Sequence, residues 1–511
     1  MKSMKYIIIA VLYLFTAVSC EKFEEINTDP NKTTKVTSAM LATQILKDTY
    51  RFWNPNASDF IQGNLFNKHI AYLDPSPYVS QYYYSNYPYG SFGSFARLTD
   101  LKYMVQYAEG GVEEPSYRGL ALYLKAAYGF SATLDMGDIP YSEAGMALDG
   151  ITKPKYDTQA EVFAAILADL QQAEAYFAEG KNFSGDIMFG GNPAKWRRLC
   201  NAMQLKVIQT MSKKATADQK ARFAAIVNAG NLMTGNDDNL KLVFTTNPNA
   251  VYPMWANGET FRIKTGPSKL AIDALKNLND RRLFYFAEPA SALIAGGLTQ
   301  QDWDAYAGAP TELAPDQLAL NNAAGNYSLL SKRYVKFMDN DPMLYFTYSE
   351  QCFIIAEAIE EGWVTGSAQT WYENGVKAIL NYYRTLPHTT GEVHGMEIDQ
   401  AYIDGYFTGA AAYATAGTKQ DRLQQIWIQR WLLDFYQGNG GNYPQFLRTG
   451  YPVYPLDPAT SLNPEDDSVY PKRWMYPTDE QTKNPVNYQQ AINSQYNGYD
   501  GINQVPWYLK D

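Results

Sequence analysis

Apolar residues recur at helical spacing along much of this chain, and this period limits the folds open to it. Thr158 and Glu161 have the spacing of a capping box, and apolar residues then line one helix face as far as Phe177. Asn192 followed by Pro193 has the pattern of an N-cap and a first helical residue. No long stretch alternates apolar and polar residues as a half-buried strand would. The sequence therefore predicts an all-α fold with small strands at most.

Two amphipathic segments in the last third of the chain form a repeat-like unit. Residues 350–361 end at Gly362, and a second apolar stripe runs from Trp371 to Tyr383. Together they span about 35 residues, close to the tetratricopeptide period. A further segment, 421–436, is followed by a glycine-rich stop. Because such helix–turn–helix units bury their apolar faces by stacking, we expect a tetratricopeptide-like array of helical hairpins.

Two internal stretches, and the tail from Tyr451 onward, lack this helical period. Residues 72–92 and 245–345 are rich in Pro, Gly, Asn and aromatic residues, a composition typical of loops. The helical array is therefore predicted to carry two long irregular insertions.

The N-terminus predicts secretion and a lipid anchor. Two lysines precede an apolar run from Tyr6 to Val18, which is too short to span a bilayer but suits a secretory signal. Small residues directly before Cys20 resemble a bacterial lipobox, in which the cysteine is acylated and becomes the new N-terminus. The alternative is an ordinary signal peptide in which Cys20 is incidental. We expect a lipoprotein signal peptide (residues 1–19), a lipid-anchored tether (20–38) and a single α-helical domain (39–511).

The charge of the chain argues against nucleic acid as a partner. The sequence has 43 Lys and Arg against 53 Asp and Glu, a formal net charge of −10. A face that binds nucleic acid needs basic residues to neutralise phosphates. Hydrophobic residues make up 46% of the chain, which is enough for a large core and excludes disorder as its main state.

Two cysteines remain besides Cys20, namely Cys200 and Cys352. Both fall on the apolar stripe of a predicted helix. A non-reducing compartment would permit a disulfide between them. Their place on separate apolar stripes favours two buried free thiols instead.

Motifs for catalysis and metal binding are nearly absent from the sequence. It has no H-E-x-x-H, G-x-S-x-G, phosphate-loop or dinucleotide pattern, and we expect no cofactor, no metal and no catalytic residue. His388 and His394 are six residues apart in a Thr- and Gly-rich segment, so we interpret them as solvated loop residues. Two alternatives stay open: an all-α glycoside hydrolase with paired carboxylates, and a scaffold that binds no ligand.

Motifs spread over the mature chain resemble those of the SusD/RagB-like lipoproteins of the Bacteroidetes. Residues 137–144 (GDIPYSEA) match the family pattern GD-x-PY-x-EA. Residues 448–452 (RTGYP) and Arg473 follow in the family's order. The match departs at residues 279–282, where NDRR stands in place of the usual DPR.

The resemblance implies a lipid-anchored protein of the outer membrane that faces the exterior. Family members place nutrient-holding loops on tetratricopeptide-like helices and act with a TonB-dependent transporter of the SusC type. By resemblance, this chain would be a non-enzymatic protein that captures oligosaccharides or peptides and passes them to such a transporter. Acidic residues directly after Cys20 resemble the family's export signal for the outer face.

We interpret the family motifs themselves as structural. Gly137 permits left-handed dihedral angles and Pro140 cannot continue a helix, so residues 137–140 predict a turn that closes one. Arg448 is predicted to be a buried or half-buried guanidinium that ties a loop to helix ends.

Aromatic residues of the two insertions are the candidates for ligand contacts. The chain has 41 tyrosines, and seven of them fall within the eighteen residues 72–89, interrupted by prolines. Rings in a stiff loop lose little entropy on binding and can stack on a sugar or a peptide side chain. They could equally cover hydrophobic helix tops. The candidate ligand-binding residues are Tyr82, Tyr83, Tyr84, Tyr87, Tyr89, Trp255, Arg262, Trp303, Tyr306 and Trp53.

Overall fold

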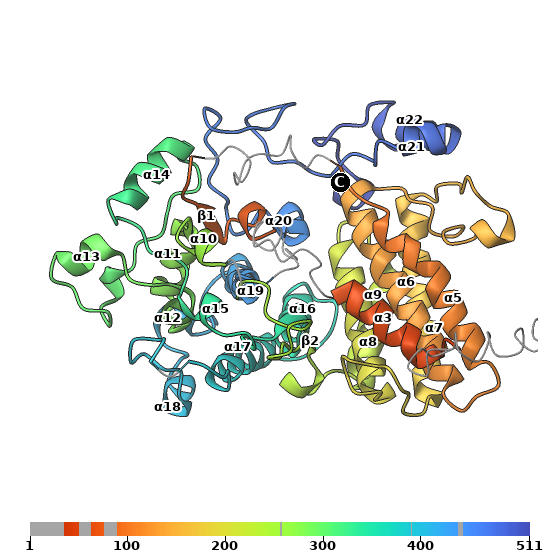
Figure 1. Cartoon of the computed structure of the whole chain (residues 1–511), viewed down its shortest axis with the longest axis horizontal. Helices are drawn as coiled ribbons and strands as arrows, with labels where there is room; N and C mark the ends of the chain where they lie inside the picture. The colour runs from red at the N-terminus through yellow and green to blue at the C-terminus, as the bar shows by residue number, and fades with distance from the viewer. Residues whose placement is uncertain (1–34, 51–62, 76–88, 256–257, 390, 438–442) are drawn as a thin grey trace, which may run out of the picture.

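Helices provide most of the regular structure in the computed structural model of the chain (Figure 1). The predicted all-α array of helical hairpins is confirmed. No helix in the described part of the chain is long and apolar enough to cross a bilayer. The structure describes residues 35–50, 63–75, 89–255, 258–389, 391–437 and 443–511.

The N-terminal helices lie side by side at one end of the molecule (Figure 1). Among them α6 packs on α7, α7 on α8 and α8 on α9, so neighbours in sequence are neighbours in space. These helices are α3 (Ser38–Tyr50), α5 (Leu98–Ala108), α6 (Glu114–Met136), α7 (Gln159–Glu179), α8 (Pro193–Thr210) and α9 (Ala217–Ala229).

The predicted start signals cap two of these helices. At the start of α7 the Thr158 side chain accepts from the amide of Glu161, and the Glu161 carboxylate accepts from the amide of Thr158. The Asn192 side chain accepts from the Ala194 amide at 3.0 Å, and Pro193 is the first residue of α8. Each cap satisfies amide groups that have no partner within the helix, and both predictions are confirmed.

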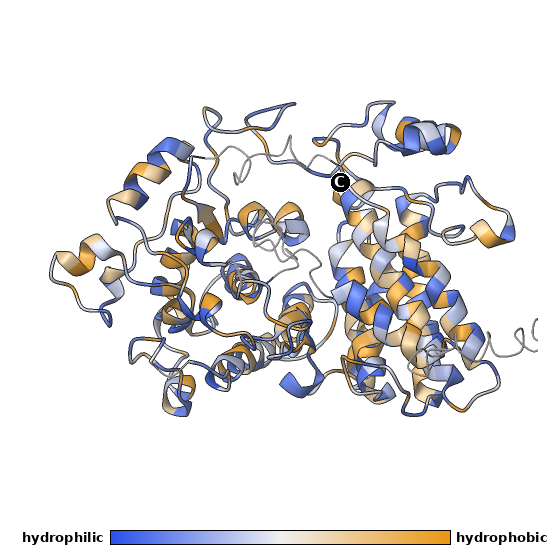
Figure 2. Cartoon of the chain, in the orientation of Figure 1, coloured by the Kyte–Doolittle hydropathy of each residue, from blue (hydrophilic) through white to orange (hydrophobic). Residues whose placement is uncertain are grey.

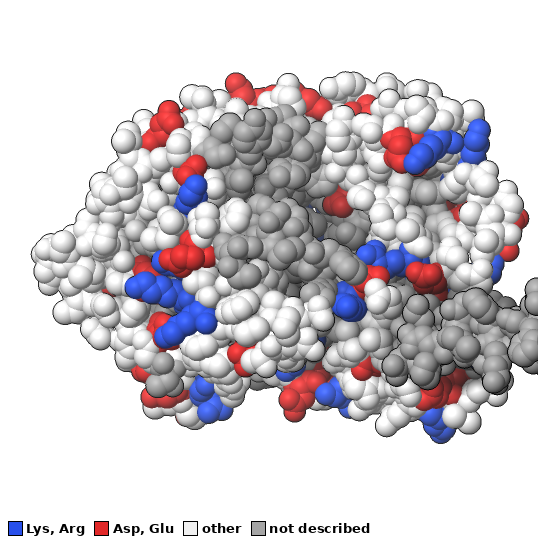
Figure 3. All heavy atoms as spheres, viewed as in Figure 1, with Lys and Arg blue, Asp and Glu red and all other residues white. Residues whose placement is uncertain are grey.

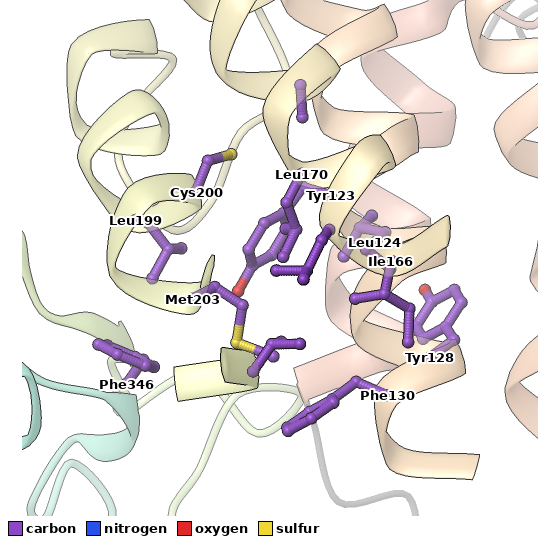
Figure 4. Close-up of a cluster of buried hydrophobic side chains, with 14 of the residues drawn as sticks. Tyr123, Leu124, Tyr128, Phe130, Ile166, Leu170, Leu199, Cys200, Met203 and Phe346 are labelled. Atoms are coloured by element: carbon purple, nitrogen blue, oxygen red, sulfur yellow. The ribbon is translucent and has the colours of Figure 1, made fainter. Parts of the chain in front are cut away.

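Apolar faces of α3 to α9 meet in a first hydrophobic core (Figures 2 and 4). Cys200 lies there beside Leu199 and faces Leu170, and its side chain is fully buried (Figure 4). Cys200 and Cys352 are both free, as predicted. Burial raises the pKa of the Cys352 thiol to about 12, so this thiol stays protonated and unreactive.

Helix α16 (Tyr348–Glu360) joins the first core to a second one. Its residues Ile354 and Ile355 belong to the first core, whereas Phe353 and Ala356 belong to the second. It packs against α8 of the N-terminal group and against α17 (Ala368–Arg384) and α19 (Lys419–Leu433). The predicted helix–glycine–helix unit is confirmed, with Gly362 between its helices at a φ of +75°.

Residues 245–345 contain more regular structure than the sequence predicts. Most of their helices have five residues or fewer, too short to show a helical period. Local caps still define them: the Ser268 side chain accepts from the Ala271 amide at the start of α11. The short helices of this half are α10 (Gly258–Arg262), α11 (Lys269–Asn277), α12 (Arg282–Phe286), α13 (Ser291–Ala295), α14 (Pro315–Ala323), α15 (Arg333–Lys336) and α18 (Gln400–Asp404).

The described strands are short, as predicted, and form two antiparallel pairs. Strand β1 (Ile70–Tyr72) pairs with β3 (Thr265–Pro267), and β2 (Leu240–Leu242) pairs with β4 (Met343–Phe346). Each pair joins segments that are far apart in the sequence.

The C-terminal segment returns to the N-terminal helices. The Trp474 amide donates to the carbonyl of Asp135 at 2.6 Å, and the Tyr508 amide donates to the side chain of Gln159 at 3.1 Å. This segment contains α20 (Tyr443–Thr449), α21 (Glu480–Lys483) and α22 (Pro485–Tyr496). Residues 472–474 and 508 are thereby placed against α6 and α7.

The sequence NDRR at 279–282 forms an ion pair inside the second core. Asp280 and Arg282 have no exposed side-chain surface, and their paired atoms lie 2.7 and 3.0 Å apart. The Gln429 side chain accepts from Arg282, and the Tyr406 hydroxyl donates to Asp280. Although residues 279–282 depart from the family motif, they still provide a carboxylate and a guanidinium that are buried and hydrogen-bonded to each other.

The prediction that His388 and His394 are solvated was wrong for His394 and holds in part for His388, whose side chain is 27% exposed. The His388 ring stacks on Phe337 with centroids 4.0 Å apart. The His394 side chain is 11% exposed, and its Nδ1 lies 3.1 Å from the Gln300 side-chain oxygen. A loop-like composition does not reveal which neighbours pack over a ring.

Candidate functional site

A cavity of about 460 Å³ lies between the N-terminal helices and the C-terminal segment. Its walls come from α6, α8, β4, α19 and α20 together with residues 472–474 and 508. Residues of the first hydrophobic core line it, together with side chains that pack against the second core. We call it the central cavity. Its volume falls in the range of about 300–1,000 Å³ that is common for small-molecule sites.

Aromatic rings form much of the cavity wall. Trp474 packs on Phe66 with centroids 5.5 Å apart and stacks on Tyr443 at 6.4 Å. Tyr50 and Tyr345 meet edge to face at 4.8 Å, and the Tyr345 hydroxyl donates to the Tyr50 carbonyl. Such rings offer flat apolar surfaces whose edges remain polar.

The first core supplies another part of this wall. Tyr123 and Phe130 of α6, Met203 of α8 and Phe346 of β4 belong to that core and also line the cavity (Figure 4). The cavity shape is therefore held by well-packed helices.

Several charged groups of the cavity are already paired. Lys206 and Arg430 both contact the Glu350 carboxylate, at 2.9 and 3.1 Å. Burial opposes ionisation of Glu350, but these two cations hold its pKa below the usual value. Arg448 binds both oxygens of Glu357, at 2.5 and 3.0 Å. These cations therefore carry internal counter-ions.

The structural interpretation of the family motifs is supported by these contacts. Arg448 is 8% exposed and ties α20 to α16 through its pair with Glu357. Gly137, at a φ of +98°, ends α6. The Asp138 carboxylate then accepts from the Gln159 amide at the start of α7, at 2.7 Å. The motif thus closes one helix and holds the next.

Three buried polar atoms at the cavity have no hydrogen-bond partner among the described residues. They are Nη2 of Arg473, Oε1 of Gln445 and the hydroxyl of Tyr508. The other guanidinium nitrogens of Arg473 bond to Asp500 and to the Met136 and Gly501 carbonyls. Because buried polar atoms are nearly always paired in folded proteins, each of these three is a place where a ligand or water can bond.

Two charged side chains at the cavity also lack a partner among the described residues. The Asp135 carboxylate makes no hydrogen bond or ion pair with the described residues, and burial raises its pKa to about 7. Burial, reinforced by the charge of Lys213, lowers the pKa of Lys472. The cavity therefore offers one acid and one base that are free to meet a ligand.

Few of the predicted ligand-binding residues can be compared with this cavity. Tyr82, Tyr83, Tyr84, Tyr87 and Trp53 lie outside the described residues. Tyr89 is 48% exposed and its backbone pairs with Met475, the residue after Trp474.

The remaining candidates lie in the second half of the molecule, away from the cavity lining. Trp255 is 40% exposed. Trp303 and Tyr306 both pack edge to face on Phe284, and Tyr306 is buried with its hydroxyl bonded to the Gln300 carbonyl. Arg262 is buried and bonds to Glu259 and to the Leu330 carbonyl. These internal contacts explain the positions of Arg262 and Tyr306 without a ligand.

The residues that line the cavity were not among the predicted ligand contacts. One signal for them exists in the sequence: the motif residues Arg448 and Arg473, each close to an aromatic residue. The structure adds the reason that they lie together: the Arg473 side chain and the Trp474 amide both donate to carbonyls at the end of α6.

Charged residues on the surface are interspersed. On the face in Figure 3, basic and acidic side chains of the described residues lie next to each other. Lys102 and Asp149 form one such exposed pair at 2.9 Å. Charges of this kind compensate one another and contribute little to stability.

Comparison with solved structures shows likeness over nearly the whole chain. A SusD homologue from Bacteroides fragilis is 34% identical, with a TM-score of 0.87 over 93% of this chain and 100% of that one. An outer-membrane protein of Bacteroides vulgatus associated with nutrient binding is 29% identical, with a TM-score of 0.81 over the same shares. A chitin-binding SusD homologue from Flavobacterium johnsoniae shares the fold at 18% identity, with a TM-score of 0.70 over 93% of this chain and 99% of that one.

The family comparison covers most of the sequence as well. No curated protein matches the chain. The SusD-like family model, described as starch-binding and associating with the outer membrane, matches residues 30–477. This chain therefore belongs to the SusD-like family of nutrient-binding proteins associated with the outer membrane.

Proposed function

We propose that this protein is a lipid-anchored receptor on the cell exterior that captures an oligosaccharide or a peptide in the central cavity. It then passes this nutrient to a TonB-dependent transporter of the SusC type. The observation that carries the proposal is the aromatic cavity with its unpartnered buried polar atoms. The membership of the chain in a nutrient-binding family supports the same role.

The chemistry of the cavity suits a polar ligand with apolar faces. Trp474 and Tyr443 present rings on which a sugar ring or an aliphatic side chain can stack. The unpartnered atoms of Gln445, Arg473 and Tyr508 include both donors and acceptors, which hydroxyl and amide groups can satisfy. Few polar groups in an apolar pocket are the usual source of ligand specificity.

Binding is better supported than hydrolysis. Glycoside hydrolases use two carboxyl groups about 5–10 Å apart at the scissile bond. Asp135 is the one carboxylate among the described residues that line the cavity. A scaffold without a ligand is also less well supported, because it would not need a cavity with unpaired polar groups.

Replacing Trp474 by Ala should weaken nutrient binding by about 1–3 kcal/mol if its ring stacks on the ligand. Isothermal titration calorimetry with a panel of oligosaccharides and peptides measures the change. Trp255→Ala is the matched control, because Trp255 is exposed and does not line the cavity. Unchanged affinity in the Trp474 variant, with a loss in the Trp255 variant, would move the site to the predicted surface aromatics.

Replacing Cys20 by Ala should release the protein from the membrane fraction, because the acyl chains would have no attachment point. Two or more chains make a lasting anchor, at about 0.8 kcal/mol for each buried CH₂ group. The net charge of −10 gives no attraction to an anionic lipid surface that could replace the anchor. Fractionation followed by a salt wash measures the effect, and a variant that stays in the membrane pellet would contradict the anchor.

A further inference from the structure

We propose that Asp135 makes the central cavity selective for a ligand that carries a primary ammonium group. Amino sugars and peptides with a free N-terminus both provide this group. The inference rests on the proposed function, because it assigns a chemical class to the ligand of the same cavity.

The position of Asp135 is fixed by backbone contacts on both sides. It lies in the last turn of α6, and its carbonyl accepts from the Trp474 amide at 2.6 Å. The next carbonyl, of Met136, accepts from Arg473 at 3.2 Å and from the Tyr496 hydroxyl at 2.9 Å. The helix end cannot shift without breaking these bonds, so the carboxylate is held at the cavity wall.

No cation of the described residues serves as the counter-ion of Asp135. Arg473 is paired with Asp500 at 2.5 Å, and Arg448 is paired with Glu357. Lys206 and Arg430 share Glu350, and Lys472 forms no ion pair with a described residue, while burial lowers its pKa. Burial alone accounts for the raised pKa of Asp135, in contrast to Glu350, whose pKa two cations lower. An ionised carboxylate in such a place is costly unless a partner arrives.

The surroundings of Asp135 suit an ammonium group. Tyr508 is close enough for Asp135 to help raise its pKa, after the larger effect of burial. Its hydroxyl oxygen has no partner and can accept a hydrogen bond from an N–H group. Trp474 adds an aromatic face, and ammonium groups are attracted to such faces. A carboxylate, a hydroxyl and an indole together satisfy the three N–H donors of a primary ammonium better than they satisfy a neutral hydroxyl.

Matched ligand pairs that differ in one amine provide the test. The first pair is the glucosamine trisaccharide and its N-acetylated form, and the second is trialanine and N-acetyl-trialanine. Calorimetric titration of the full mature protein at pH 7 should show the free amine binding at least about tenfold tighter in one pair. A tenfold difference in affinity corresponds to one charge-assisted hydrogen bond. The pair that shows the preference identifies the source as amino sugar or peptide.

The same preference should weaken in acid. The trialanine pair is the one to measure, because its α-amino group, with a pKa of about 8, is about nine-tenths charged at pH 7 and fully charged at pH 5.5, whereas Asp135 becomes protonated over this range. The affinity for the free amine should therefore fall about tenfold between these two pH values, as expected for one titrating group. The acetylated ligand should show no comparable fall.

Variants separate this inference from the proposed function. In Asp135→Asn the affinities for the two members of a pair should converge and lose their dependence on pH. Asp149→Asn is the control, because Asp149 is an exposed acid that does not line the cavity, and it should keep the preference. Equal affinities within both pairs for the unaltered protein would overturn the ammonium inference and leave the proposed function standing. If none of the four ligands binds but other oligosaccharides without amines do, the ammonium inference is overturned too. If no nutrient binds at all, the proposed function is overturned as well.

Discussion

Arg282→Met should lower the free energy of unfolding by about 3–5 kcal/mol, the usual cost of leaving a buried charge without its partner. Asp280 and Arg282 are fully buried and joined by two hydrogen bonds. The variant keeps the bonds to Asp280 from the Tyr406 hydroxyl and from the amide of residue 282, but these are less than a full counter-charge. Urea unfolding followed by circular dichroism measures the loss.

An exposed ion pair provides the control for this prediction. Lys483 of α21 and Asp479, the residue directly before this helix, lie 2.7 Å apart, and both remain largely in contact with water. Lys483→Met should leave the unfolding midpoint nearly unchanged, because solvent screens such pairs. Equal effects of the two substitutions would show that burial of the Asp280–Arg282 pair is not what makes it important.

Asp135→Asn should stabilise the protein at pH 8 by about 2–4 kcal/mol and have almost no effect at pH 4. The native pKa of Asp135 is raised to about 7, whereas an unfolded Asp titrates near 3.9. Between these values the native state holds a proton that the unfolded state has lost, so stability falls as pH rises. The penalty is absent below about pH 4 and complete above about pH 7. Asparagine cannot ionise, so the Asp135→Asn variant does not have this penalty.

The difference between the variant and the unaltered protein isolates Asp135. Burial, together with the charge of Glu350, also raises the pKa of Asp434 to about 7, so the unaltered protein and the variant share that contribution. Thermal unfolding at several pH values measures the difference. A stabilisation that does not change from pH 4 to pH 8 would mean that Asp135 titrates as an ordinary exposed acid. A residue that costs stability in the absence of ligand is typical of a functional site.

Signals that act within a few residues made much of the fold predictable. The caps at Thr158 and Asn192 and the turn at Gly362 depend on hydrogen bonds and dihedral angles of near neighbours. The paired apolar stripes on either side of Gly362 likewise predicted α16 and α17. Most helices of 245–345 escaped prediction because five residues or fewer cannot display a period of 3.6.

The site was not predictable in the same way, because its residues meet through contacts between distant segments. Arg473 bonds to Met136, which is 337 residues away in the sequence. Aromatic composition suggested binding residues, but it could not distinguish Tyr306, which packs on Phe284, from Trp474, which lines the cavity. Both are aromatic residues in irregular segments, and only the tertiary structure separates them.

The contribution of the C-terminal segment to the cavity wall sets an order of events during synthesis. Helices α3 to α9 can begin to pack as soon as they emerge, since most of their contacts are with one another. Lys472, Trp474 and Tyr508 reach α6 and α7 only when almost all of the chain has been made. The cavity is therefore completed last, and a chain still in transit has no site in which to hold a nutrient. Ligand capture begins with the finished molecule.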